Sequence, residues 1–124
     1  MRYMCLICAE VVMEQMSDED ARRHYEEYAD FTKAIKEDGH FVTANRLEPA
    51  ASATTIRVRG GRTSVTDGPF AETKEQFGGY YIIDARDLNE AIRVAEKIPG
   101  ARFGCVEIRP VAQDAQTLAL GLDA

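Results

Sequence analysis

Cysteine and histidine are scarce in this chain, whose 124 residues include three cysteines and two histidines. So few cysteines, in an odd number, exclude a disulfide scaffold and are typical of the reducing cytoplasm, where we place the protein. Neither His24 nor His40 has a histidine or cysteine at the spacing of a zinc site. The sequence therefore predicts no built-in metal and no cofactor.

Cys5 and Cys8 form a C-x-x-C string, the spacing of many redox pairs. Such pairs begin a helix, where backbone amides and the helix dipole lower the thiol pKa. Here the string lies in an apolar segment, residues 3–8, that is typical of a strand. Residues three apart on a strand point to opposite faces. We therefore interpret both side chains as inert core thiols.

Long apolar runs and an excess of positive charge are also absent. No segment approaches the roughly 20 apolar residues that span a bilayer, and the opening MRYMCLICAEVVMEQ lacks the basic stretch and cleavage site of a signal peptide. Fifteen Lys and Arg against 21 Asp and Glu give a net charge of −6, which repels phosphate backbones. We expect neither a membrane nor a nucleic acid as a partner.

Hydrophobic spacing predicts the order β-α-β-β-α-β. Long helices are expected after the capping residues Ser17 and Asp87, and a short helical turn after Thr73, ended by Gly78 and Gly79. A Gly-Gly pair at residues 60–61 predicts a β-hairpin. The expected strands cover residues 3–8, 40–47, 54–59, 62–66, 80–84 and 103–109.

This order predicts an α+β, ferredoxin-like domain with an antiparallel sheet and both long helices on one face. The domain is expected to cover residues 1–110, with residues 111–124 as its C-terminal tail. The first strand is apolar on both sides, and an uncovered apolar face would be a large exposed patch. We therefore predict a homodimer that packs sheet face on sheet face.

His24 lies on the apolar stripe of the first helix, between Phe31 and Ile35 when residues are spaced about 100° apart. Burial there favours the neutral imidazole. Two interpretations stay open: a core histidine bonded to a backbone carbonyl, or a general acid or base at a cavity mouth, which needs an oriented carboxylate. His40, just past a helix stop at Gly39, is expected to be a solvated loop residue.

The segment DGPFAETKE begins at Asp67 and lies between two strands. Asp-Gly-Pro is first of all turn chemistry, yet a polar loop of this kind also often holds a site. Arginines on the strands would pair with its acids or with an anionic ligand. Asp67 is the candidate catalytic partner of His24. The candidate ligand-binding residues are Glu72, Thr73, Lys74, Arg46, Arg109 and Tyr80.

At DGPFAETKEQFGGYYIIDARDLNEA the sequence resembles the DGPF family of YCII-related proteins. The match runs from MRYMCLI through LEPAASATTIRVRGGRTSVTDGPF to PGARFGCVEIRPV and covers nearly the whole chain. The resemblance implies a bacterial protein with a dimeric α/β barrel built on the ferredoxin-like fold. It also implies a regulatory or accessory role, because DGPF-type proteins are associated with extracytoplasmic-function sigma factors.

The resemblance extends to one residue of a proposed acid–base pair. In the wider YCII-like group a histidine of the first helix is paired with an aspartate, and His24, in RRHYEEY, is similar to that histidine. The group's aspartate follows the second helix, where this chain has Ile98, Pro99 and Gly100. That carboxylate is absent, and Asp67 is the candidate substitute.

Three functions therefore stay open. The favoured one is a small-molecule-binding or regulatory homodimer, whose ligand is anionic or cyclic. The alternative is a small-molecule enzyme of the lyase or isomerase type that uses His24 to move a proton. The third is a structural domain without a ligand.

Overall fold

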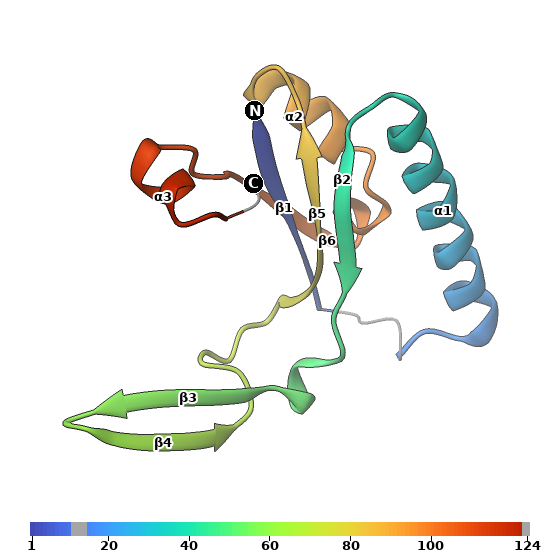
Figure 1. Ribbon diagram of the computed structural model, residues 1–124. Helices are drawn as coiled ribbons and strands as arrows, with labels where there is room; N and C mark the ends of the chain where they lie inside the picture. The colour runs from blue at the N-terminus through green and yellow to red at the C-terminus, as the bar shows by residue number, and fades with distance from the viewer. Residues whose placement is uncertain (11–14, 123–124) are drawn as a thin grey trace.

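The computed structural model describes residues 1–10 and 15–122, and it confirms the α+β, ferredoxin-like arrangement (Figure 1). One sheet has the strand order β2-β5-β1-β6, and each neighbouring pair is antiparallel. Its strands are β1 (Arg2–Ala9), β2 (Phe41–Arg46), β5 (Gln76–Asp84) and β6 (Gly104–Pro110). Among the described residues, no helix is long and apolar enough to cross a membrane.

Both long helices pack on the same face of this sheet, as predicted. They are α1 (Asp18–Glu37) and α2 (Leu88–Ala95), and the 3-10 turn η3 (Pro99–Arg102) follows α2. Ser17 and Asp87 cap the two helices: each side chain accepts a hydrogen bond from a backbone N–H three residues on, at 3.2 Å and 2.9 Å. The buried core between helices and sheet comprises Tyr3, Cys5, Phe31, Ile35, Tyr81, Ile83, Ala85, Ala91, Val94, Ala95 and Ile98.

The opposite face of the sheet is covered by neither α1 nor α2. Met4 and Ile82, which are register partners, and Leu6 alternate with the core residues of β1 and β5, so they point to this face. All three are half-buried in the single chain. We call this surface the open face.

The two thiols of the C-x-x-C string lie on opposite sides of β1, as strand geometry predicts. Cys5 is buried in the core, and burial raises its pKa to about 11, so it is inert. Cys8 is half-buried on the open face, where it is the register partner of Cys105. The interpretation of Cys8 as a core thiol is therefore wrong.

The predicted helical turn after Thr73 is absent, because β5 already begins at Gln76. Gly78 and Gly79 lie inside this strand rather than ending a helix. A Cβ on Gly79 would lie 3.0 Å from the carbonyl oxygen of Asn45, so glycine lets β2 approach closely. From the local sequence this Gly-Gly pair predicts the end of a helix. Here Gly79 instead allows close packing of two strands.

His40 is not the solvated residue that its position predicts. It is half-buried, and its Nδ1 lies 2.7 Å from the carbonyl oxygen of Asp84. Its backbone N–H donates to the carbonyl of Ile35 at 2.9 Å. His40 therefore joins the end of α1 to the end of β5, and its role is structural.

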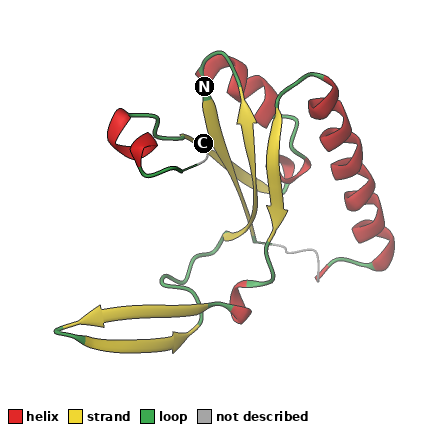
Figure 2. Ribbon diagram, viewed as in Figure 1, coloured by secondary structure: helices red, strands yellow, loops and turns green. Residues whose placement is uncertain are grey.

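Two segments project from this body (Figures 1 and 2). The first is the predicted hairpin of β3 (Thr54–Arg59) and β4 (Arg62–Asp67), reached through the 3-10 turn η2 (Ala50–Ser52). Its turn is made by Gly60 and Gly61, with φ angles of 57° and 76° that favour glycine. The second is the tail with the short helix α3 (Ala115–Ala119).

Candidate functional site

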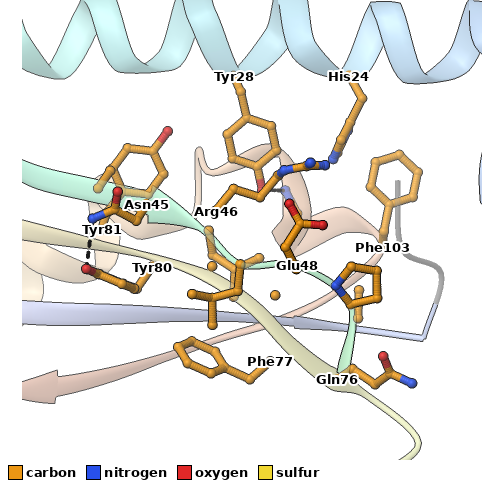
Figure 3. A pocket seen from close by; sticks show the side chains of 18 of the residues that line it. His24, Tyr28, Asn45, Arg46, Glu48, Gln76, Phe77, Tyr80, Tyr81 and Phe103 are labelled. Carbon is orange, nitrogen blue, oxygen red and sulfur yellow. Dashed lines mark hydrogen bonds between the residues drawn. The ribbon is translucent and has the colours of Figure 1, made fainter. Parts of the chain in front are cut away.

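A cavity of about 290 Å³ lies between the first half of α1 and the sheet, at the end where β2 stops and β5 begins (Figure 3). Most of its wall is apolar or aromatic. The aromatic lining residues are Tyr25, Tyr28, Phe77, Tyr80, Tyr81 and Phe103, and the lining also includes His24, Arg46 and Glu48.

His24 points from α1 toward this cavity and is half-buried (Figure 3). Its ring packs edge-on against Tyr28, with centroids 4.9 Å apart, and against Phe103 at 5.3 Å. Burial lowers the pKa of His24 below its usual value; Arg102 lowers it further, and the Glu27 carboxylate opposes both. His24 is therefore a neutral imidazole near pH 7, able to accept a proton or a hydrogen bond.

Tyr28, one helical turn after His24, forms the inner wall of the cavity. Its ring is stacked parallel to Tyr81 at 6.4 Å, and its hydroxyl accepts a hydrogen bond from the backbone N–H of Gly100 at 3.1 Å. Burial raises the pKa of Tyr28 to about 12, so the hydroxyl keeps its proton. A Cβ on Gly100 would lie 2.7 Å from this hydroxyl, which explains glycine at the position.

Arg46, at the end of β2, extends toward α1 on the side of His24 and Tyr28 (Figure 3). Its guanidinium carbon lies 5.8 Å from the centroid of the Tyr25 ring, within range of a cation–π contact. Glu48, two residues later, lines the same cavity as the chain leaves the sheet before Pro49. An aromatic cavity thus carries a cation, a carboxylate and a neutral imidazole.

Three of the residues proposed from the sequence line this cavity: His24, Arg46 and Tyr80. Tyr80 contributes to the lining from β5, but its side chain lies on the open face, where its hydroxyl accepts a hydrogen bond from the Asn45 amide at 2.9 Å. The helical period placed His24 correctly on the sheet-facing side of α1.

The structure brings none of the other proposed residues into the cavity lining. Asp67 is exposed at the end of β4, on the projecting hairpin, and Glu72 is exposed in the loop that follows. Lys74 pairs with Glu10 at 3.1 Å, and the Thr73 hydroxyl donates to the carbonyl of Glu75. Arg109 pairs with Glu107 on β6.

Sequence reasoning missed Glu48, Tyr28 and Phe103 as cavity residues. Tyr28 follows His24 by four residues and so shares its side of the helix, but a residue on that side is core or cavity wall depending on what faces it. Phe103 packs on His24 only because β6 returns beside β1. The one local signal for Glu48 was its spacing of two residues from Arg46, at the end of a strand.

A model of the YCII-related domain matches residues 1–113. The chain belongs to the YCII-related family. An uncharacterized protein of Rhizobium meliloti (strain 1021), R00369, is 38% identical to this YCII-related chain over 105 residues, which are 83% of this chain and 85% of that protein.

A solved structure has a similar fold. It is 5-chloro-2-hydroxyhydroquinone dehydrochlorinase (TftG) from Burkholderia phenoliruptrix AC1100, in complex with 2,5-dihydroxybenzoquinone. The TM-score is 0.51 with 11% sequence identity, and the match covers 94% of this YCII-related chain and 98% of the other. At that identity the likeness concerns the fold alone.

Proposed function

We propose that this YCII-related protein is a homodimer that binds a small, planar, anionic ring compound in the cavity beneath α1. The observation that carries the proposal is the combination of Arg46 with aromatic walls in one cavity of about 290 Å³. This volume is at the lower end of the range for ligand pockets and suits a single ring.

The cavity wall explains why the ligand is a ring. Tyr28 and Tyr81 are stacked parallel, and Phe103 presents an aromatic surface beside His24. Aromatic rings favour offset-stacked or edge-on contacts with another ring, and such contacts add to the gain from apolar burial.

The polar groups of the cavity explain why the proposed ligand is an anion. Arg46 is the one positively charged residue in the described lining, and a guanidinium binds a carboxylate, sulfonate or phenolate oxygen in a charge-assisted hydrogen bond. Glu48 disfavours a second anionic group nearby and favours a hydroxyl donor on the ring. The Tyr28 hydroxyl keeps its proton and supplies a further donor.

Nuclear magnetic resonance (NMR) tests this proposal with two probes, benzenesulfonate and 2,5-dihydroxybenzoquinone, the compound bound to the enzyme of similar fold. Backbone amide signals of Gly79 and Gly100, which line the cavity, should shift with a common saturation curve. The amide signals of Thr63 and Val65, on the projecting hairpin, serve as the internal control, and their chemical shifts should not change. No saturable shift with either probe would overturn the proposal.

The homodimer rests on apolar surface that the single chain leaves uncovered. The open face carries Met4, Leu6 and Ile82, and the tail exposes Leu118, Leu120 and Leu122. Packing two open faces together would form a dimeric α/β barrel. Light scattering should give twice the mass of the chain.

A regulatory role would also require a stable complex with a cognate sigma factor, which a pull-down at micromolar concentration would detect.

Anion binding should strengthen in acid, because the lowered pKa of His24 leaves the ring neutral at pH 7.5 and protonated only at lower pH. Protonation then adds a positive charge beside the bound anion. We expect benzenesulfonate, whose own charge is constant, to bind about three- to tenfold more tightly at pH 5 than at pH 7.5. Calorimetry on wild type and His24→Gln measures this, and the variant should lose most of the change. Binding that weakens in acid would contradict the assignment.

A second candidate function, proton transfer by a lyase- or isomerase-type enzyme, is favoured because an imidazole, His24, and a carboxylate, Glu48, line the same cavity. A neutral imidazole is a general base near pH 7. TftG, of similar fold, is a dehydrochlorinase. If His24 moves protons, the ring C–H groups of 2,5-dihydroxybenzoquinone should exchange with D₂O about 100-fold faster with wild type than with His24→Gln. Equal rates would reject the enzymatic version and leave ligand binding standing.

A further inference from the structure

The hairpin of β3 and β4 has an apolar face that no described part of the chain covers. Ile56 and Val65 are cross-strand partners, and Val58 lies two residues along the same face. Their exposed fractions are 64%, 64% and 57%. A soluble monomer seldom exposes three adjacent β-branched side chains to this extent.

The other face of the same hairpin is basic. Arg57 alternates with Ile56 and Val58, and Arg59 is the register partner of Arg62. Residues 54–67 contain these three arginines and one aspartate, a net charge of +2, whereas the whole chain has −6. The hairpin is therefore a basic segment attached to a body that carries −8.

This pattern is that of a sheet packed on one side and solvated on the other. A two-stranded hairpin without a packing partner is marginally stable in water. Yet this hairpin is held firmly at its base, where the Gly68 N–H donates to the carbonyl of Ala53 at 2.7 Å and the Thr55 hydroxyl to the carbonyl of Gly68 at 2.7 Å. The hairpin therefore projects in a fixed position, and its apolar face would be stabilised by a surface that covers it.

We infer that the hairpin is an arm that lays its Ile56–Val58–Val65 face on a second copy of this chain. Charge selects this occupant: two arms would repel each other, whereas each basic arm is attracted to the acidic body of the other copy. The inference rests on the homodimer of the proposed function and not on the cavity ligand. In this arrangement Arg57, Arg59 and Arg62 lie at the solvated rim.

The segments before and after the arm reach the cavity. Ala50, which precedes β3, and Gln76, which begins β5, both line it. If the arm of one copy docks on the second copy, the chain on either side of that arm is held in place. This would fix the part of the cavity rim that Ala50 and Gln76 form in the first copy.

Two variants of adjacent residues on β4 test the arm by sedimentation equilibrium. Val65→Asn places an amide on the apolar face, and Ser64→Asn places the same amide on the basic face. We expect Val65→Asn to raise the dimer dissociation constant at least tenfold and Ser64→Asn to change it less than threefold. Equal effects of the two variants would overturn the arm contact.

A second measurement does not depend on the folding of any variant. In a dimer mixed from ¹³C-labelled and unlabelled chains, isotope-filtered NMR should show contacts from the methyl groups of Ile56, Val58 and Val65 to protons of the unlabelled copy. A dimer without such contacts rejects the arm and keeps the homodimer. A wild-type monomer rejects both. Neither result changes saturation of the cavity by benzenesulfonate, so the ligand-binding proposal is tested separately.

Discussion

Gly104→Ala should lower the free energy of unfolding by about 3 kcal/mol or more, because the added methyl group has no space. Gly104 begins β6 opposite Ala9 in the ladder with β1. A Cβ there would overlap the carbonyl oxygen of Cys8 and lie 2.7 Å from the Cα of Ala9. These are backbone atoms of a central strand, so they cannot move aside without breaking the β1–β6 pairing.

Gly78→Ala is the matched control, since Gly78 also lies in a strand, its φ is not in the left-handed region, and nothing lies within 4 Å of its Cβ position. Its effect should stay within about 1 kcal/mol. Urea unfolding of both variants, at one protein concentration because a dimer links stability to concentration, gives the comparison. Similar stabilities for the two variants would show that β1 and β6 are not paired in this register.

The elements of the fold were predictable because their signals are local. Ser17 and Asp87 each cap a helix through bonds to residues three positions on. Alternation along β1 separates Cys5 from Cys8 whatever the rest of the chain does. The failures came where a distant strand decides: Gly79 lies in a strand because β2 approaches it, and His40 is half-buried because β5 ends beside it.

The cavity was predictable only in part, for the same reason. The helical period shows that His24 faces the sheet, but Glu48 reaches the same cavity through the path of the chain after β2. The role of Asp67 as a partner of His24 required its loop to fold back on α1. The projecting hairpin carries Asp67 outside the cavity lining, a placement that no local pattern determines.

Arg46→Met should weaken binding of benzenesulfonate about 10- to 100-fold. A hydrogen bond to a charged group contributes about 1.5–3 kcal/mol, and each 1.4 kcal/mol corresponds to a factor of ten in affinity. Methionine keeps an apolar stem against Tyr25, so the change removes mainly the charge and the donors. Arg46→Lys keeps the charge without the planar fork and should lie between wild type and Arg46→Met.

Arg59→Met is the control, because it removes the same charge from the end of β3, outside the cavity lining. Calorimetry with benzenesulfonate should show this variant within about twofold of wild type. An uncharged ring of similar size, benzyl alcohol, separates charge recognition from ring stacking. Its affinity should change little in Arg46→Met, since the aromatic wall is intact. If Arg46→Met and Arg59→Met weaken benzenesulfonate binding equally, the effect is long-range charge, and Arg46 does not contact the anion.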